Sequence, residues 1–328
     1  MNIRNIFFLA LCALTFTACG GDDDNDNNDD GVVRNTNCND SILKKNPSLP
    51  REITRLEFPR VKTDGHNLVV VHKTSDKYDP QGVNYSLEWD CNKKSSRWVA
   101  YMMHKATGVT GRTDAWAEDP DIPSSYRFSD TNYMYKGSGF TRGHICGSAD
   151  RLYSVEANRQ TFYYSNMQPQ YYNFNAGDDY SGVWVKMESQ VRTWANQTSK
   201  DAKGNYIPDT LYVVKGGTID RENQILMRIK GELIVPRYFF MAILCKYAGG
   251  YRALGFWAEH NSEQGMNYYA NVFGKKASDI TLSDFVVNID ELEELTGLDF
   301  FCNLPDNIED KIEKLPADNV RRIWGLSK

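Results

Sequence analysis

The chain has 328 residues, of which 41% are apolar and 12% aromatic, and this composition excludes a wholly disordered protein. Its formal charge of −5 disfavours a nucleic-acid partner, yet six aspartates within residues 22–30 account for that excess. The remainder is close to neutral. Any contact with a polyanion would therefore depend on local arginines and a bound cation, because no strong long-range field is available.

The first 18 residues have the pattern of a signal peptide. A basic residue, Arg4, precedes an apolar run over residues 6–16, and small residues stand before Cys19. The run is too short to cross a membrane. Because Cys19 directly follows Thr17 and Ala18, the segment resembles the lipobox of bacterial lipoproteins, so we expect Cys19 to carry lipid. Ordinary signal cleavage beside an incidental cysteine is the alternative.

Residues 19–44 are expected to form an acidic tether after the lipidated cysteine. The run GGDDDNDNNDDG contains no apolar residue and cannot bury a core, and its like charges would extend it. An acidic run in this place also resembles the surface-export signals of some Gram-negative lipoproteins. We therefore expect lipid anchoring to the outer membrane with the protein exposed at the cell surface, and the periplasmic face remains open. The lipid would be its contact with the membrane.

Five cysteines would remain after removal of the signal peptide and lipidation of Cys19. An odd number leaves at least one thiol unpaired unless pairing occurs between chains. No CxxC pair occurs, which disfavours a zinc ribbon. The remaining cysteines are Cys38, Cys91, Cys146, Cys245 and Cys302.

Residues 45–325 are expected to form one mixed α/β (α+β) domain. After an irregular polar stretch over residues 38–60, runs rich in β-branched and aromatic residues predict strands, and a polar segment over 105–138 predicts a long surface loop. Apolar spacing at 183, 184, 187, 191 and 194 predicts a helix over 183–195, and another helix is expected over 289–297. Strands are predicted at 66–73, 83–90, 97–104, near 144, 211–219, 232–247 and 252–260, with a helix between residues 154 and 163.

Polar residues capable of phosphate chemistry gather between residues 139 and 188. His144 follows Arg142 and Gly143, so a tight backbone would bring a base and a planar guanidinium together. No histidine forms an HExxH pair, which disfavours a zinc hydrolase of that kind, and the other four histidines are interpreted as structural. Downstream, Asn166 and Asn175 offer neutral oxygen ligands suited to hydrated magnesium, although asparagine is more often a turn former.

These residues carry a resemblance to a known family. The segments GFTRGHICGSADR, TFYYSNMQPQ, FN and W-x-x-x-E resemble the centre of the DNA/RNA non-specific endonucleases, the ββα-metal nucleases. Further similar segments at 97–101, 116–120, 213–217, 235–236 and 292–305 follow in the family's order, so the resemblance covers about residues 65–310. It implies a central antiparallel-rich sheet flanked by helices, with a ββα-metal motif at the active site.

The resemblance implies a role for each candidate residue. His144 matches the general base, Asn175 the direct magnesium ligand, and Glu188 the acidic residue that orders the metal's waters. Trp184 and Glu188 lie four residues apart and share one helix face, where Trp184 would anchor the helix. The other polar site residues implied by the match are Arg142, Asn166 and Arg112.

Three departures from the family pattern concern this site. Thr141 stands where the family usually has aspartate, and residues 176–181 (AGDDYS) are inserted between Asn175 and Trp184. Arg112 matches the remaining family arginine by lying four residues before Trp116, whereas other members place that arginine where this chain has Asp114.

The sequence therefore predicts a Mg²⁺-dependent endonuclease, which Mn²⁺ could also support, with DNA and RNA as substrates. One alternative is a catalytically weak or inactive surface lipoprotein that binds nucleic acid or glycan, and another is a phosphodiesterase for a different substrate. The sequence gives no oligomeric state. We also consider a disulfide between Cys91 and Cys146 that would fix the active-site turn, against two buried free thiols.

Overall fold

The computed structural model describes residues 34–106 and 108–326, which belong to one compact unit. The predicted signal peptide, lipidated Cys19 and most of the acidic tether lie outside the described residues. Residues 34–44, which the sequence placed in the tether, belong to the compact unit because Asn39 and Ile42 are buried. The boundary of the folded domain therefore moves back to Arg34. Within the described residues, no helix is both long and apolar enough to cross a membrane.

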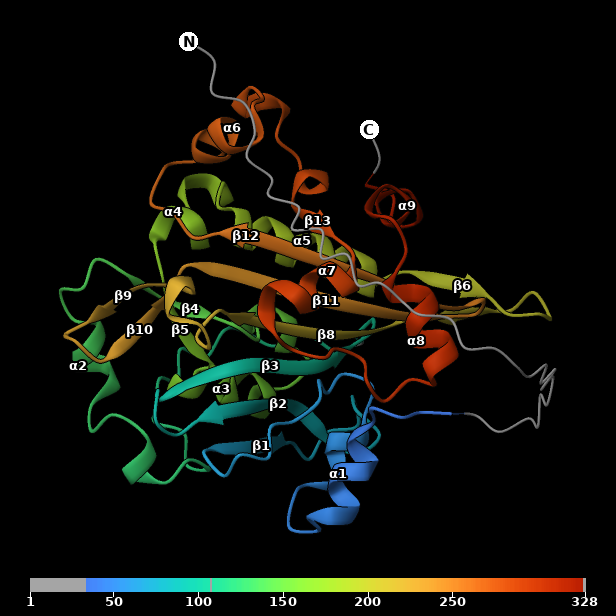
Figure 1. The fold of residues 1–328 in the computed structure, drawn as a ribbon, viewed down its shortest axis with the longest axis horizontal. Helices are drawn as coiled ribbons and strands as arrows, with labels where there is room; N and C mark the ends of the chain where they lie inside the picture. Colours follow the sequence, from blue (N-terminus) through green and yellow to red (C-terminus); the bar gives the residue numbers. More distant parts are fainter. Residues whose placement is uncertain (1–33, 107, 327–328) are drawn as a thin grey trace, which may run out of the picture. The chain divides into compact units, whose positions relative to one another are not determined.

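The described chain alternates strands with short helices (Figure 1). The helices are α1 (Asn39–Lys45), α2 (Thr131–Tyr135), α3 (Val155–Gln160), α4 (Tyr172–Asn175), α5 (Val183–Ala195), α6 (Asn267–Phe273), α7 (Ile289–Thr296), α8 (Asp306–Glu313) and α9 (Ala317–Ile323). The strands are β1 (Asn67–Lys73), β2 (Val83–Asp90), β3 (Ser95–Met103), β4 (Thr141–His144), β5 (Met167–Gln170), β6 (Thr198–Lys200), β7 (Tyr206–Pro208), β8 (Thr210–Gly217), β9 (Ile225–Ile229), β10 (Leu233–Pro236), β11 (Tyr238–Tyr247), β12 (Gly250–Glu259) and β13 (Val286–Val287).

A seven-stranded sheet in the order β1-β2-β3-β8-β11-β12-β13 forms the centre of the fold. Each neighbouring pair runs antiparallel, which confirms the predicted antiparallel-rich sheet. The longest pairing joins β11 to β12, from Tyr238 opposite Glu259 to Tyr247 opposite Gly250. Three two-stranded ribbons, β4-β5, β6-β7 and β9-β10, lie outside this sheet.

Both faces of the sheet are covered, which explains why its strands read as nearly continuous apolar runs. Val213 belongs to the core cluster that contains α5, whereas its neighbour Val214 belongs to the cluster that contains α7 and α8. Successive side chains of a strand point to opposite faces, so β8 contributes side chains to the core on each face of the sheet. Figure 1 shows α7 and α8 in front of the sheet and α5 behind it.

The two predicted long helices form where the sequence placed them. Trp184, Met187 and Val191 of α5 are buried along one stripe, as their spacing requires. The side chain of Asn288 caps α7 by accepting a hydrogen bond from the backbone N–H of Glu291. Gly297 ends α7 with φ at 73°, a left-handed conformation that glycine adopts without steric cost.

The predicted single strand over 232–247 is divided into β10 and β11. Pro236 ends β10, where the register against β9 also shifts, and Arg237 separates the two strands. Proline has no N–H to donate to a ladder, so the chain leaves the β9-β10 ribbon there and enters the main sheet. The strand prediction was therefore correct in type but missed this break.

The disulfide considered between Cys91 and Cys146 does not form, and the alternative of free thiols holds, with Cys146 buried and Cys91 half-buried. Cys146 is buried within the core cluster that contains α5, whereas Cys91 follows the end of β2 and packs against that cluster while only partly buried.

Candidate active site

The β4-β5 ribbon and helix α5 hold the candidate active site together. The two strands pair antiparallel, with His144 opposite Met167. Trp184 on α5 donates its indole N–H to the backbone oxygen of His144 over 3.2 Å. Gly143 is needed here, since a Cβ at that position would lie 2.2 Å from Oε1 of Gln170. The helix is thus tied to the strand that carries the histidine, as the expected ββα motif requires.

The His144 ring lies between two aromatic side chains. Its centroid is 5.5 Å from that of Trp116 and 5.0 Å from that of Phe162. Burial, and then the positive charge of Arg112, lowers the pKa of His144 to about 3, although a hydrogen bond to the backbone of Arg142 acts in the opposite direction. Nε2 is buried and has no hydrogen-bond partner. At neutral pH the ring therefore offers an uncharged nitrogen that can accept a proton.

Arg142 approaches the same aromatic group from the neighbouring residue of β4. Its Cζ lies 4.7 Å from the ring centroid of Trp116, a cation–π distance, and one guanidinium nitrogen donates to Asn132. Its Nε has no hydrogen-bond partner. The guanidinium is thus fixed by packing while retaining a donor for an anion.

Arg112 reaches the site from the loop before β4. Its Cζ lies 4.7 Å from the ring centroid of Phe162, which also contacts His144. Nη1 donates to Oγ of Ser148 and Nε to a carboxylate oxygen of Asp114, each over 2.8 Å. The structure therefore brings Arg112, Arg142 and His144 together around Trp116 and Phe162, which are themselves in contact.

Asn175 is oriented by the residue that replaces the family aspartate. Its Nδ2 donates to Oγ1 of Thr141 over 3.0 Å, and that hydroxyl donates to the backbone oxygen of Gln170 over 2.9 Å. None of the described residues donates a hydrogen bond to the amide oxygen of Asn175. The inserted segment 176–181 closes back on its own start: the backbone N–H of Gly182 donates to the backbone oxygen of Ala176 over 2.8 Å, and a Cβ on Gly182 would lie 2.6 Å from the backbone oxygen of Asn175.

Glu188 lies at the end of a buried chain of charges. Its Oε1 is 3.1 Å from Nζ of Lys215, which is fully buried and lies 3.4 Å from Oδ2 of Asp150. Burial raises the pKa of Glu188, and Lys215 opposes this shift. Burial would also raise the pKa of Asp150, but Lys215 and Arg192 lower it to about 2. A Cβ on Gly147 would lie 2.9 Å from Oε1 of Glu188, so the carboxylate touches the turn that follows β4.

Lys215 and Asp150 were not singled out from the sequence. A lysine inside the apolar strand VVKGG is a detectable signal, because a fully buried ammonium needs a carboxylate partner. The identity of that partner depends on tertiary structure, since Asp150 lies 65 residues away in the chain.

The Asn166 amide is hydrogen-bonded to backbone groups at both ends. Its Oδ1 accepts the backbone N–H of Cys146 over 2.8 Å, and its Nδ2 donates to the backbone oxygens of Cys146 and Thr161. The side chain is fully buried, and both ends of its amide are occupied by backbone. Asn166 therefore holds the segment after His144 in place, with no group left to contact a substrate directly.

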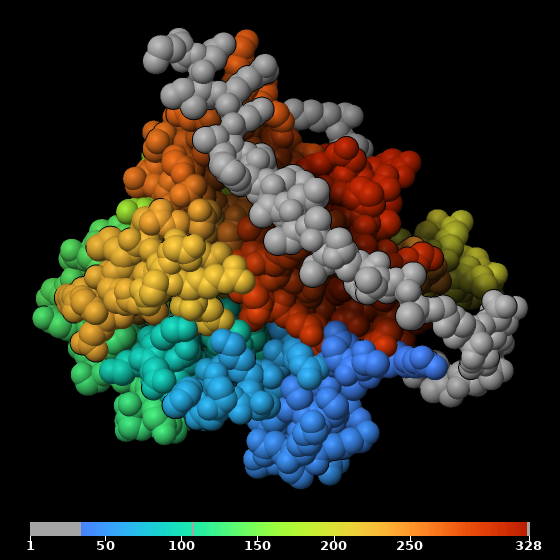
Figure 2. Space-filling view, viewed as in Figure 1, coloured from blue at the N-terminus to red at the C-terminus, as the bar shows by residue number. Residues whose placement is uncertain are grey.

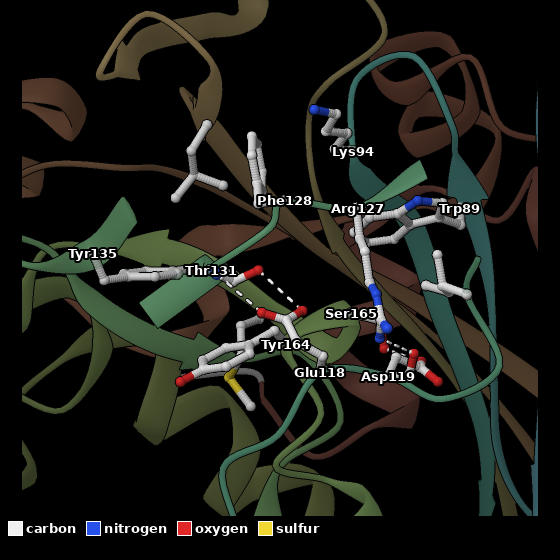
Figure 3. A pocket seen from close by; sticks show the side chains of 13 residues that line it. Trp89, Lys94, Glu118, Asp119, Arg127, Phe128, Thr131, Tyr135, Tyr164 and Ser165 are labelled. Carbon is white, nitrogen blue, oxygen red and sulfur yellow. Dashed lines mark hydrogen bonds between the residues drawn. The ribbon is translucent and has the colours of Figure 1, made fainter. Parts of the chain in front are cut away.

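A small cavity lies beside the site and is too tight for a nucleotide. The cavity has a volume of about 10 Å³, and Tyr135 and Tyr164 belong to its lining. The ring centroid of each tyrosine lies 5.9 Å from Cζ of Arg142. Figure 3 shows Arg127 directed at Asp119 and Glu118 bonded to Thr131 across it. A space of this size holds roughly one water.

His72, Asp119 and Asp121 form a second group with potential metal ligands. Both ring nitrogens of His72 face carboxylates, at 3.1 Å from Asp119 and 3.2 Å from Asp121. Burial would lower the pKa of His72, but these hydrogen bonds raise it to about 9. The three side chains form an ion pair that is buried at His72 and Asp119 and exposed at Asp121, and a metal could bind there only by displacing the proton from the ring.

The oxygen donors at the β4-β5 site fit a hard cation. Asn175 offers an amide oxygen, and Glu188 offers a carboxylate that is held in place from behind by Lys215. Such ligands suit magnesium or manganese and disfavour zinc, which prefers nitrogen and sulfur.

Three comparisons relate the chain to known nucleases. The chain is 29% identical over 238 residues to the mitochondrial nuclease EXOG of Xenopus laevis, covering 68% of this chain but only 58% of that protein. It is 28% identical over 243 residues to a nuclease of Nostoc sp., covering 73% of this chain and 79% of the relative. A crystal structure of the EndoG/EndoGI complex shares the fold, with a TM-score of 0.56 and 20% identity over 79% of this chain and 95% of the other. The family model for DNA/RNA non-specific endonucleases matches residues 69–307, and the chain belongs to that family.

Proposed function

We propose that this protein is a Mg²⁺-dependent endonuclease that cuts both DNA and RNA, with His144 as the general base and Mn²⁺ able to replace Mg²⁺. The observation that carries the proposal is the unpartnered Nε2 of an uncharged His144 beside two arginines. Membership of the endonuclease family and the hard oxygen donors of Asn175 and Glu188 support it.

His144 would take a proton from the attacking water at Nε2. The hydrogen bond between its ring and the Arg142 backbone favours the tautomer with a free lone pair on Nε2. The contacts with Trp116 and Phe162 fix the plane of the ring, so little reorganisation is needed when the proton moves. A bound phosphate would also raise the pKa of His144 from its value in the free protein, because a nearby anion favours the protonated ring.

Arg142 and Arg112 would bind the scissile phosphate and offset the negative charge that develops during attack. Arg142 has a free Nε and a guanidinium held against Trp116. Because the phosphates of DNA and RNA are chemically alike, a site that contacts phosphate alone should cut both polymers.

Asn175 would hold the metal ion and Glu188 would order the ion's waters, which are the roles that their oxygens permit. The ion, when bound, supplies positive charge at the scissile phosphate and at the leaving oxygen. Thr141 would fix which end of the Asn175 amide faces the ion, since its hydroxyl already engages Nδ2.

The cellular location is also a proposal. We infer from the sequence of residues 1–30 that Cys19 carries lipid and tethers the nuclease to the outer membrane, with the domain facing outward. Labelling of intact cells with an antibody against the domain, before and after protease treatment, distinguishes the cell surface from the periplasm.

The activity is tested by incubating the purified protein separately with supercoiled plasmid and with a structured RNA, with Mg²⁺, with Mn²⁺ and with EDTA. We expect both polymers to be cut with either metal and neither with EDTA. Full cleavage in EDTA would exclude a metal-dependent mechanism. The absence of cleavage under every condition would exclude nuclease activity.

A further inference from the structure

The rim of the active site continues from Arg142 onto helix α2. One guanidinium nitrogen of Arg142 donates to Oδ1 of Asn132, and Tyr133 is the next residue of this helix. Tyr133 is 58% exposed. An aromatic ring therefore meets solvent next to the arginine that we assign to the scissile phosphate. The chemistry proposed for the site gives this ring no role.

Lys230 lies against Tyr133 from the turn between β9 and β10. Its ammonium is 3.3 Å from the centroid of the Tyr133 ring and donates to the backbone oxygen of Tyr133. In the part of the chain that the structure describes, no carboxylate forms an ion pair with Lys230, whereas Arg228 of the same ribbon is paired with Glu222. An ammonium has three donors, and the Tyr133 carbonyl uses one, so two remain for an anion.

Helix α2 and the β9-β10 ribbon are held together by one apolar cluster. Met134 and Tyr135 of α2 are buried in it with Ile229 and Leu233 of the ribbon, and Met167 of β5 joins them. Figure 1 shows α2 beside this ribbon, and Figure 2 shows the green surface of the segment that contains α2 against the yellow-orange surface of the ribbon. Because β5 pairs with β4, the cluster also fixes the exposed tyrosine and lysine relative to the strand that carries the candidate base.

Rings and cations alternate along the row that leads from His144 to Lys230. Trp116 contacts both the His144 ring and the Arg142 guanidinium. Beyond Arg142, the Tyr133 ring is followed by the Lys230 ammonium. Proteins that bind single-stranded nucleic acid combine a cationic track for phosphates with aromatic rings on which unpaired bases stack. The row therefore fits a single strand that passes through the active site.

We propose that Tyr133 and Lys230 form a subsite for one unpaired nucleotide next to the scissile phosphate, with its base stacked on Tyr133 and its outer phosphate bound by Lys230. This inference rests on the proposed nuclease function and adds a preference for single-stranded segments. The ammonium covers one face of the Tyr133 ring, so the base stacks on the other face. A base that is paired inside a duplex cannot reach the ring, and duplex substrates gain nothing from this subsite.

The test measures binding of a labelled oligothymidylate by fluorescence anisotropy, in EDTA so that no metal-dependent cleavage occurs. Tyr133→Ala should weaken this binding about tenfold, because it removes the surface on which the base stacks. Tyr133→Phe keeps the ring and should bind like the parent chain. A blunt-ended duplex has no unpaired base, so the parent and Tyr133→Ala should bind it equally.

Lys230→Ala tests the phosphate contact. It should weaken binding of the oligothymidylate and reduce the slope of log Kd against log salt concentration by about 0.7, the contribution of one phosphate contact on a single strand. The β6-β7 ribbon offers a matched control pair, since Tyr206 is 69% exposed and has the ammonium of Lys200 5.0 Å from its ring centroid. Tyr206→Ala and Lys200→Ala should bind like the parent.

Cleavage in Mg²⁺ separates this proposal from the nuclease function itself. Both subsite variants should raise KM for a single-stranded substrate, while kcat changes by less than about twofold, as expected when binding alone is lost. A parent chain that binds and cuts DNA while Tyr133→Ala and Lys230→Ala bind the oligothymidylate equally well would overturn the subsite alone. A parent chain that neither binds nor cuts nucleic acid would overturn the nuclease and the subsite together. If one variant does not fold, the other gives an independent comparison, because each removes a different contact.

Discussion

The hydroxyl of Thr141 lies 3.0 Å from the amide nitrogen of Asn175 and donates its own proton to the backbone of Gln170. This arrangement fixes the orientation of the Asn175 amide, because the nitrogen is held by Thr141 and the oxygen is left for a ligand. A residue that departs from the family's aspartate therefore still contacts the proposed metal ligand, by a neutral hydrogen bond.

Replacing Thr141 by valine keeps the shape of the side chain and removes this hydrogen bond. We expect half-saturation by Mg²⁺ to rise about fivefold, since a neutral hydrogen bond is worth about 1 kcal/mol. The measurement is the initial rate of plasmid cleavage as a function of Mg²⁺ concentration. Thr141→Ser keeps the hydroxyl and is the matched control.

An aspartate at position 141 could accept the same N–H from Asn175 and would add a negative charge beside the metal. Thr141→Asp should therefore lower the Mg²⁺ concentration at half-saturation. The metal-saturated rate should change by less than about tenfold, or roughly 1.4 kcal/mol in barrier height. Superimposable Mg²⁺ curves for the parent, Thr141→Val and Thr141→Asp proteins would show that residue 141 has no part in metal binding.

His144→Ala should abolish most cleavage while leaving the protein folded and able to bind DNA. Loss of a general base costs a factor of about 10²–10⁴ in rate. The ring makes no hydrogen bond through Nε2, so its removal gives up one hydrogen bond, the one to the backbone of Arg142. Cleavage and DNA binding are measured in parallel with the melting temperature. A variant that melts far below the parent would instead identify His144 as a residue of the core.

Lys215→Met should destabilise the fold strongly. The ammonium is the shared partner of Glu188 and Asp150, and its removal leaves two buried carboxylates facing each other. Breaking a buried ion pair from one side costs about 3–5 kcal/mol. Urea unfolding followed by tryptophan fluorescence measures the change. Arg228→Met breaks the exposed pair with Glu222 and should leave the unfolding midpoint nearly unchanged, so similar midpoints for both variants would contradict the importance of Lys215.

Local patterns were sufficient to predict the main elements of the fold. Helix α5 was predicted from the spacing of its apolar residues, and α7 was expected to begin near Asn288 or Asp290 and to end at Gly297, where the structure has its caps at Asn288 and Gly297. The break between β10 and β11 was missed because it depends on which strand pairs with β9, and a single sequence does not give that pairing. The order of the strands in the sheet, and the failure of Cys91 to meet Cys146, depend on tertiary structure in the same way.

The candidate site could be found from motif spacing, but the state of its residues could not. His144, Arg142 and Arg112 were named from the sequence, whereas their common contact with Trp116 and Phe162 depends on the folded loop. The sequence also does not show that backbone groups occupy the Asn166 amide. Likewise, Asn37 donates a hydrogen bond to Glu309, 272 positions away in the chain, and composition alone could not predict that contact.

The buried carboxyl of Glu313, at the end of α8, should make the fold less stable as the pH rises. Burial and repulsion raise the pKa of Glu313 to about 10, above the ordinary value of 4.5. Between these values the folded protein keeps a proton that the unfolded chain has released. The contribution of this carboxyl group to the free energy of unfolding is therefore complete below about pH 4.5 and is lost as the pH rises toward 10. Glu313→Gln has no such proton to lose. The stability of this variant relative to the parent should therefore increase with pH.

This comparison is made from urea unfolding midpoints at pH 5, 7 and 9, measured in EDTA so that no divalent metal is bound. Glu263→Gln removes an exposed carboxylate and controls for the change in net charge, and it should follow the parent at every pH. If the difference between Glu313→Gln and the parent stays constant across this range, the Glu313 carboxyl ionises as it does in water. The burial of its Oε1 would then impose no cost on the folded protein.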